Sequence, residues 1–304
     1  MGPWLVTGGS GFLGRHVLDA AVAAGEQVVA LGRLVPAGWD ASAFVRADLD
    51  DCEGLARAIA QVAPSTVIHA AGRTPPAGPD ELDRGNARAT VHLLDAIRAT
   101  GRACRVVAAG SAAELGPVAE ADLPVGELHP CGPVEPYGIS KLAATATILA
   151  ARRPITGLVA RLFNLIGPGM APTQAFGRFA RLLAAPGSGA VRLEVGDLDA
   201  RRDFIDVRDA ARAMVLLAAR GDPGRVYHVG NGRSRRVGEG LQHLIRRSGR
   251  EVEVIEHRAA GSGPRDSIAD LGALVRATGW APRFGFERSL DDLWDGVAAG
   301  RGCD

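Results

Sequence analysis

The glycine-rich segment TGGSGFLG, residues 7–14, constrains the fold of this chain more than any other feature. It follows the apolar run WLVT and precedes a stretch with helical periodicity. Gly8 permits a tight turn, Gly11 lets the backbone approach a pyrophosphate, and Gly14 allows a helix to pack closely on a strand. The unpaired N–H groups of the helix N-terminus then face the phosphates. A strand, this turn and a helix in that order predict a dinucleotide-binding unit rather than a tight turn alone.

Short β-branched runs alternate with longer segments of helical periodicity, which is typical of a parallel sheet covered by helices on both faces. We expect strands at residues 4–7, 27–31, 43–46, 66–70, 104–109 and 156–163, and helices at 11–24, 51–61, 81–100 and 137–153. The alternation then weakens. Further helices are expected at 175–185, 210–220, 238–248 and 290–298, and further strands at 191–195, 202–207, 225–230 and 252–256.

Length and composition exclude several classes of protein. The 304 residues can bury a sizeable core, and 47% of them are hydrophobic. The formal net charge is +1, so no overall field favours a nucleic acid or a membrane surface as partner. The four cysteines form neither a CxxC pair nor a disulfide framework, so we expect a reduced, cytoplasmic setting and no metal site. We expect neither a signal peptide nor a membrane anchor, because no long apolar run is present.

The end of the second expected strand favours NADP(H) over NAD(H). There a carboxylate would bind a ribose 2′-OH, whereas an arginine would accept a 2′-phosphate. The strand QVVAL is followed by Gly32 and Arg33, and the next acidic residue is Asp40. The guanidinium of Arg33 can pair with a phosphate that a carboxylate would repel. The alternative is that Arg33 points to solvent.

The chain contains a single lysine, Lys141, among 35 residues that are lysine or arginine. One of its two tyrosines, Tyr137, lies four positions earlier, so on a helix the two share a face. An ammonium there favours tyrosinate and lowers the phenol pKa from its usual value of about 10. That shift brings the phenol closer to the range useful for proton transfer near neutral pH. We therefore predict that Tyr137 and Lys141 are a catalytic pair.

Four motifs carry a resemblance to a known family: TGGSGFLG, HAAG at 69–72, Ser111 in AAGSAAELG, and YGISK at 137–141. Together they resemble the extended short-chain dehydrogenase/reductase family, in its sugar-nucleotide epimerase/dehydratase branch, over nearly the whole chain. The resemblance implies that Ser111 hydrogen-bonds the substrate carbonyl or hydroxyl oxygen and that Tyr137 exchanges a proton with it. It also implies that Lys141 lowers the Tyr137 pKa and holds the nicotinamide ribose.

The same resemblance places Asp48 and Leu49 in the adenine pocket and residues 70–72 beneath the cofactor. We expect His69, in the same strand, to be a buried structural histidine. The expected cofactor contacts are Gly8, Ser10, Gly11, Phe12, Leu13, Gly14, Arg33, Asp48, Leu49, Ala70, Ala71, Gly72, Tyr137 and Lys141.

The predicted fold class is α/β, a Rossmann-type doubly wound parallel sheet with a smaller, discontinuous C-terminal substrate-binding lobe. Residues 1–165 are expected to form the NADP-binding domain, to which about 203–232 return. Residues 166–202 and 233–304 are expected to form mainly the substrate-binding lobe.

The residues after Ser111 indicate which reaction this scaffold supports. Related 4,6-dehydratases carry an acid two positions after the catalytic hydroxyl, whereas Ala112 and Ala113 follow Ser111 here, and Glu114 is expected to face elsewhere. Methyl groups cannot act as general acids or bases, so dehydration is disfavoured. Related epimerases carry an acid where Arg33 stands. A ketoreductase needs only a hydride donor, a proton donor and a polarising hydroxyl, which the nicotinamide, Tyr137 and Ser111 supply.

Segments 160–169, 191–210 and 226–232 are similar to the family's reductases of GDP-4-keto-6-deoxy-D-mannose, which form GDP-D-rhamnose. This similarity implies that Asn164, Arg202 and Arg265 contact the nucleotide-sugar diphosphate, which guanidinium groups bind well. The alternatives are an ion pair of Arg202 with Asp203 or Asp206, and one of Arg265 with Asp266 or Asp270. Leu115 departs from the related pattern, which has an aromatic residue there, so the hexose is less well defined than the reaction.

Two other functions are considered beside the 4-ketoreductase. One is an NAD(P)-dependent nucleotide-sugar 4-epimerase or 4,6-dehydratase, and the other is a non-catalytic NADP-sensing protein. The family resemblance also implies a homodimer through the helices at 81–100 and 137–153. The apolar positions of these helices could equally be filled by intramolecular core: Leu93, Leu94, Ile97, Leu142, Ile148 and Leu149.

Overall fold

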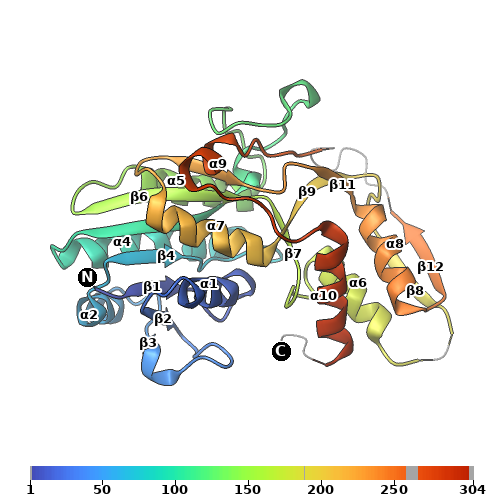
Figure 1. Ribbon diagram of the computed structural model, residues 1–304, viewed down its shortest axis with the longest axis horizontal. Coiled ribbons are helices and arrows are strands. Elements are labelled where there is room, and N and C mark those ends of the chain that lie inside the picture. Colours follow the sequence, from blue (N-terminus) through green and yellow to red (C-terminus); the bar gives the residue numbers. More distant parts are fainter. Residues whose placement is uncertain (1, 188, 258–265, 301–304) are drawn as a thin grey trace.

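A seven-stranded parallel sheet forms the centre of the protein (Figure 1). The computed structural model describes residues 2–187, 189–257 and 266–300. In spatial order the strands are β10 (Val226–Val229), β6 (Ile155–Leu162), β5 (Cys104–Ser111), β4 (Thr66–His69), β1 (Trp4–Thr7), β2 (Val28–Gly32) and β3 (Phe44–Arg46). The strand order reverses between β1 and β4, so the segments after these two strands border the crevice in which such sheets bind ligands. The predicted α/β class and the predicted strands are confirmed.

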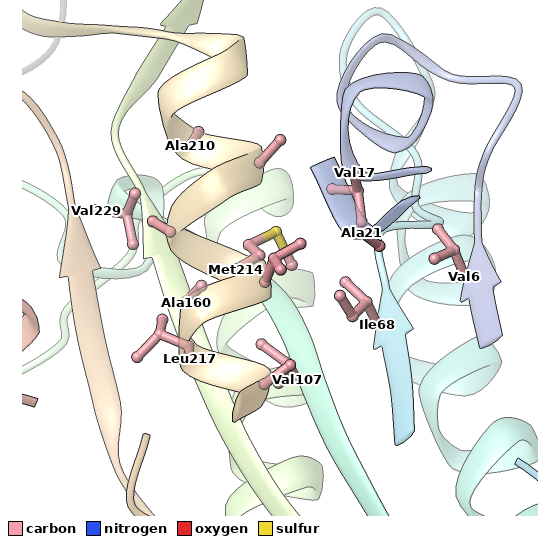
Figure 2. Close-up of a cluster of buried hydrophobic side chains, with 14 of the residues drawn as sticks. Val6, Val17, Ala21, Ile68, Val107, Ala160, Ala210, Met214, Leu217 and Val229 are labelled. Atoms are coloured by element: carbon pink, nitrogen blue, oxygen red, sulfur yellow. The ribbon is translucent and has the colours of Figure 1, made fainter. Parts of the chain in front are cut away.

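Helices cover both faces of the sheet because its strands are apolar on both sides. In β1, Val6 points into one core cluster and Leu5 into the other, as alternating side chains of a strand must. The first cluster is closed by α1 (Phe12–Ala23), α7 (Val207–Arg220) and α9 (Gly272–Thr278). Figure 2 shows part of it, with Met214 of α7 lying between that helix, α1 and the sheet. The second cluster is closed by α2 (Cys52–Val62), α4 (Ala89–Ala99) and α5 (Pro136–Leu149).

The helix expected at 81–100 is not a single regular helix. A short helix, α3 (Pro79–Leu82), is followed by a π-helical turn at Asp83–Arg88 and then by α4. Asn86 lies in the π turn with its side chain buried. Helical periodicity cannot reveal such a turn, because it is set by side-chain contacts elsewhere in the fold. Such turns occur frequently at functional sites.

A third cluster of buried side chains lies beside the sheet, at the right of Figure 1. It is built by α6 (Ala175–Ala184), α8 (Val237–Ser248) and α10 (Phe286–Ala298), with a two-stranded sheet of β8 (Val191–Val195) and β12 (Val252–Glu256). Phe176, Phe204 and Phe286 are at its centre, with ring centroids 5.1–5.9 Å apart. These aromatic contacts hold segments that are far apart in sequence.

A small sheet joins the third cluster to the large sheet. Its strands are β7 (Asn164–Ile166), β9 (Arg201–Asp206) and β11 (Ser234–Arg236). The sequence analysis missed β7, β11 and α9, which are short. It also placed the start of α7 too late, because Asp206 caps this helix by accepting a hydrogen bond from the Arg208 amide at 2.8 Å.

The apolar side chains considered for a dimer face lie mostly in the intramolecular core. Leu93, Leu94, Ile97 and Ile148 are at most 2% exposed and pack in the second cluster. They therefore give no support to a dimer. Among the described residues, no helix is long and apolar enough to span a membrane.

Candidate active site

The turn after β1 can be formed only by glycine at two of its positions. Gly8 has a φ of +75°, and a Cβ there would lie 2.6 Å from the Ala71 nitrogen. A Cβ at Gly14 would lie 2.0 Å from the Gly8 carbonyl oxygen. The N-cap of α1, Gly11, supplies no side chain to the first N–H groups of the helix. The turn therefore leaves backbone donors for an anion, as the sequence predicted.

A cavity of about 240 Å³ lies at this turn and extends along the carboxyl ends of β2, β3 and β4. The expected cofactor residues that line it are Gly8, Ser10, Gly11, Arg33, Asp48, Leu49, Ala70, Ala71 and Gly72. Of the other expected cofactor residues, Phe12, Leu13 and Gly14 on α1 and Tyr137 and Lys141 on α5 do not line it. Lining residues that the sequence analysis did not name as cofactor contacts are Thr7, Leu31, Gly32, Ala47, Asp50, Arg73, Gly85 and Ala89. The donors of the turn and the lining residues after β1, β2, β3 and β4 fit a dinucleotide.

Arg33 stands directly after β2 at the edge of the cavity and is exposed. It makes no ion pair with any carboxylate in the described parts of the chain. Asp48 and Asp50 line the same cavity, and the Asp48 carboxylate accepts the Asp50 amide at 3.1 Å. Because this guanidinium has no ion-pair partner among the described residues, it is available to bind a phosphate.

Ser111 and Tyr137 are brought together by the end of β5 and the first turn of α5. Ser111 is the last residue of β5 and the N-cap of a short 3₁₀ turn, where its Oγ accepts the Ala113 amide at 3.2 Å. A Cβ at Gly138 would lie 2.3 Å from the Ala113 carbonyl oxygen, so α5 rests directly on this turn. The Ser111 side chain lies close enough to the Tyr137 hydroxyl to lower the pKa of that phenol.

The expectation that Lys141 lowers the Tyr137 pKa is not met in this structure. Burial raises the pKa of the Tyr137 phenol, the hydrogen bond with Ser111 lowers it, and the charge of Glu114 raises it further. Lys141 lies on the predicted face of α5, but it is only 8% exposed and its ammonium donates to the Ala109 carbonyl oxygen. Burial also lowers the pKa of Lys141 itself. Desolvation, rather than the ammonium of Lys141, therefore dominates the pKa of the phenol.

His69 is a structural residue, as predicted. Its ring hydrogen-bonds the Thr7 hydroxyl at 2.7 Å and the Thr90 hydroxyl at 3.3 Å. Burial, followed by the charge of Lys141, lowers its pKa to about 3. The ring is therefore neutral at physiological pH.

Asn86 is a contact residue that the sequence analysis missed. Its side-chain oxygen accepts the Arg73 amide at 2.8 Å, and its amide group donates to the Arg73 carbonyl at 3.0 Å and to the Ser140 hydroxyl at 2.9 Å. The π turn thus ties the cavity lining to α5. No pattern in the sequence reveals this, because the partners are distant in the chain.

Glu114 makes contacts that the sequence analysis did not predict. Its carboxylate accepts the Ser111 backbone amide at 2.7 Å and pairs with Arg161 at 2.9 Å. The four residues SAAE form a capping box, in which Ser111 and Glu114 satisfy each other's backbone amides. The S-x-x-E spacing could have revealed this contact.

The expected diphosphate contacts lie on the small sheet. Asn164 is on β7 and donates to the Asp203 carbonyl oxygen at 3.3 Å, and Arg202 is on β9. Arg265 lies outside the described residues. Leu115 is buried at 3% exposure against Val125 and Phe163 rather than facing a ligand.

The alternative pairing of Arg202 with Asp203 or Asp206 is not formed. The Asp203 carboxylate accepts three backbone amides, and Asp206 pairs with Arg208 at 2.7 Å. The acidic groups that act on Arg202 are Asp266 and Asp197.

Comparisons with known proteins agree with this geometry. The sequence profile of the NAD dependent epimerase/dehydratase family matches residues 4–230. The chain is 36% identical to the GDP-6-deoxy-D-mannose reductase of Pseudomonas aeruginosa, covering 94% of this chain and 93% of the relative. It is 32% identical to the dTDP-6-deoxy-L-talose 4-dehydrogenase (NAD(P)(+)) of Kitasatospora kifunensis, covering 95% and 93%.

A solved structure extends the similarity to the fold. The NADPH complex of RMD from Pseudomonas aeruginosa superposes with a TM-score of 0.85 at 31% identity, covering 98% of this chain and 99% of the other. Proteins named UDP-glucose 4-epimerase and dTDP-glucose 4,6-dehydratase also match, for example at 29% and 27% identity.

Proposed function

Because this chain belongs to the NAD dependent epimerase/dehydratase family, we propose that it is an NADPH-dependent 4-ketoreductase of a nucleotide-activated 6-deoxyhexose. The proposed reaction converts GDP-4-keto-6-deoxy-D-mannose to GDP-D-rhamnose. The observation that carries the proposal is the placement of the Ser111 side chain against the Tyr137 hydroxyl, with only alanine at the two positions after Ser111. This pair can polarise and protonate a carbonyl oxygen.

In the proposed reaction, Tyr137 gives its proton to the C4 oxygen of the sugar as hydride arrives. Ser111 donates a hydrogen bond to the same oxygen and stabilises the charge that develops there. Bound NADPH supplies the hydride. Lys141 supplies positive charge near the ribose and is held by the Ala109 carbonyl.

The surroundings of Glu114 argue against dehydration, and the position of Arg33 argues against epimerisation. Elimination of water needs a further acid or base near the sugar, but Ala112 and Ala113 have none to offer, and both oxygens of Glu114 are bound within the protein. Arg33 supports an exchangeable NADPH rather than a permanently held NAD, and the NADPH complex of the RMD protein supports the same choice. A non-catalytic NADP sensor is disfavoured because it needs no proton donor.

The names of two relatives support a nucleotide-linked 6-deoxysugar as substrate. One is a GDP-6-deoxy-D-mannose reductase and the other a dTDP-6-deoxy-L-talose 4-dehydrogenase. We propose GDP as the nucleotide because the GDP relative has the higher identity of the two. Asn164, Arg202 and Arg265 remain the proposed diphosphate contacts.

The remaining proposals concern organisation. We propose that residues 1–165, with 203–232, bind NADP and that 166–202 with 233–304 mainly bind the sugar nucleotide. A cytoplasmic location and a homodimer are also proposed. Light scattering of the purified protein tests the dimer, and a monomeric mass at micromolar concentration would remove it.

The decisive test mixes the purified protein with NADPH and a panel of freshly made GDP-, dTDP- and UDP-4-keto-6-deoxysugars. We expect loss of absorbance at 340 nm with the GDP sugar and a product whose mass is two hydrogens larger. No oxidation of NADPH with any sugar, while a known reductase consumes it, rejects the ketoreductase. Release of tightly bound NAD on denaturation would favour an epimerase or dehydratase.

A further inference from the structure

A fully buried carboxylate lies directly behind the candidate catalytic serine. Glu114 is 0% exposed, and its Oε1 accepts the Ser111 amide at 2.7 Å. Its Oε2 accepts both Nε and Nη2 of Arg161, at 3.0 and 2.9 Å. Burying a charge is costly unless it is paired and hydrogen-bonded, so this arrangement satisfies the carboxylate completely.

The backbone is shaped to admit this carboxylate. A Cβ at Gly110 would lie 2.7 Å from Glu114 Oε1 and equally close to a methyl group of Val159. Any larger residue at position 110 would therefore displace the Glu114 carboxylate or Val159 on the neighbouring strand. The sequence GSAAE combines the space, the hydroxyl and the carboxylate in five residues.

Arg161 extends the contact to two further parts of the protein. It is 2% exposed, and its Nη1 lies 3.3 Å from Nε2 of His228 on β10. Its Nη2 donates to the Cys131 sulfur at 3.3 Å. His228 in turn hydrogen-bonds the Val125 carbonyl at 3.0 Å. Cys131 and Val125 belong to the irregular segment between β5 and α5.

Charged and titratable groups from β6, α5, β10 and the segment between β5 and α5 surround Glu114. Arg161 on β6 carries the compensating positive charge, and Lys141 on α5 is the second cation. His228 on β10 is neutral at physiological pH, because burial and the Arg161 charge lower its pKa to about 4. Tyr137 on α5 and the Cys131 thiol complete the set. Burial raises the pKa of Tyr137 and the Glu114 charge adds to this shift, whereas burial lowers the pKa of Lys141 and the Glu114 charge opposes that shift.

We infer that Glu114 is a positioning residue that holds the backbone of Ser111, and that Arg161 couples this serine to the segment between β5 and α5. The serine hydroxyl then meets Tyr137 in one orientation, and the same ion pair sets the electrostatic surroundings of that phenol. This inference rests on the proposed reduction, in which Ser111 and Tyr137 share the sugar oxygen.

The first experiment compares kinetics of two buried-carboxylate variants. Glu114→Gln keeps an oxygen acceptor but presents an amide to Arg161, whereas Asp209→Asn is the matched control. Asp209 is also 0% exposed, accepts the Arg283 and Phe284 amides at 2.7 and 2.9 Å, and pairs with Arg212, far from Ser111 in the fold. We expect kcat of Glu114→Gln to fall at least about tenfold, or about 1.4 kcal/mol, with KM for NADPH unchanged. The control should keep its kcat.

A second, double variant separates loss of activity from loss of folding. Glu114→Leu with Arg161→Met replaces the pair by apolar groups, a change that is often neutral for stability. The Ser111 amide then has no carboxylate acceptor, so kcat should stay low although the melting temperature is near that of the natural protein. A kcat equal to that of the natural protein in this double variant contradicts the inference.

A third measurement does not depend on turnover. The chain has two tyrosines, so subtracting the tyrosinate titration of Tyr137→Phe leaves the signal of Tyr137. We expect Glu114→Gln to lower the midpoint of this titration, because a negative charge is removed, and Asp209→Asn to leave it unchanged. An unshifted midpoint together with normal kcat overturns the inference. If no sugar of the panel is reduced by the natural protein, the proposed function fails, and the titration alone decides the inference.

Discussion

The ammonium of Lys141 donates a hydrogen bond to the carbonyl oxygen of Ala109, two residues before Ser111 on β5. The single lysine is therefore attached to the same strand that carries the candidate catalytic serine. It is anchored by backbone rather than by Tyr137. This contact holds the amine beside the cavity, since a Cβ at the lining residue Gly72 would lie 3.9 Å from Lys141 Nζ.

Lys141→Gln tests the charge of this anchor. Glutamine can still donate to Ala109, so the fold should be kept, but the positive charge is lost. We expect kcat to fall at least about tenfold, equivalent to about 1.4 kcal/mol. Arg152→Gln removes an exposed positive charge just beyond α5 and should have no effect on steady-state kinetics. Equal kcat in the two variants contradicts the role of Lys141.

Tyr137→Phe removes only the phenolic hydroxyl group, the proposed proton donor. We expect kcat to fall by about 10²–10⁴, the usual contribution of general acid–base catalysis, while the Kd for NADPH is unchanged. Tyr227→Phe is the matched control, because that hydroxyl contacts Asp222 and lies outside the site. Stopped-flow turnover and fluorescence titration measure the two quantities. Retained turnover in Tyr137→Phe would show that another acid carries the step.

Arg33→Ala tests the choice of cofactor. Losing the guanidinium should raise KM for NADPH at least about tenfold, or about 1.4 kcal/mol, and leave KM for NADH nearly the same. Arg46→Ala removes an arginine on the adjacent strand β3 that does not line the cavity. If the ratio of KM for NADPH to KM for NADH is unchanged in Arg33→Ala, Arg33 does not select the cofactor.

Gly14→Ala should abolish cofactor binding with little change elsewhere. Its Cβ would lie 2.0 Å from the Gly8 carbonyl, so the turn that faces the cavity must move. Gly296→Ala in α10 meets no atom within 4 Å and should stabilise the protein by about 0.5–1 kcal/mol. Calorimetric titration with NADPH checks the first variant and chemical denaturation the second. Normal NADPH affinity in Gly14→Ala is incompatible with the proposed turn.

The protein should lose stability as pH falls from 6.5 to 4. The pKa values of His69 and His228 are lowered to about 3 and about 4, so between these values and 6.5 the unfolded chain binds more protons than the native one. Asp203 acts in the opposite direction below pH 6, because burial raises its pKa to about 6. Two histidines against one aspartate leave a difference of about one proton between the unfolded and the native state for these three groups. Their combined effect lowers the free energy of unfolding by about 1.4 kcal/mol for each pH unit.

Urea denaturation at pH 7, 6, 5 and 4 measures this slope. His69→Gln should flatten it, whereas His257→Gln, at an exposed position, should not. A slope that is the same in all three proteins contradicts the assignment to His69.

Local patterns predicted the large sheet and most helices because their causes are local. In the strands, apolar residues either alternate with polar ones or form continuous runs. Helix α2 is capped by Asp51, whose carboxylate accepts the Gly54 amide at 3.0 Å. Elements whose boundaries depend on distant partners were missed, such as β7 and β11, which pair with β9. The same holds for the π turn around Asn86, whose side chain makes three hydrogen bonds, two to Arg73 on a loop and one to Ser140 on α5.

The amino-acid sequence by itself determined the α/β class, the glycine turn and the placing of Tyr137 and Lys141 on one helix, since each follows from spacing along the chain. Only the tertiary structure decided the electrostatics. It turned Lys141 toward Ala109, raised the pKa of Tyr137 by burial, and set Glu114 between Ser111 and Arg161. Charge interactions depend on distance and on exclusion of water, and both arise only when segments far apart in sequence pack together.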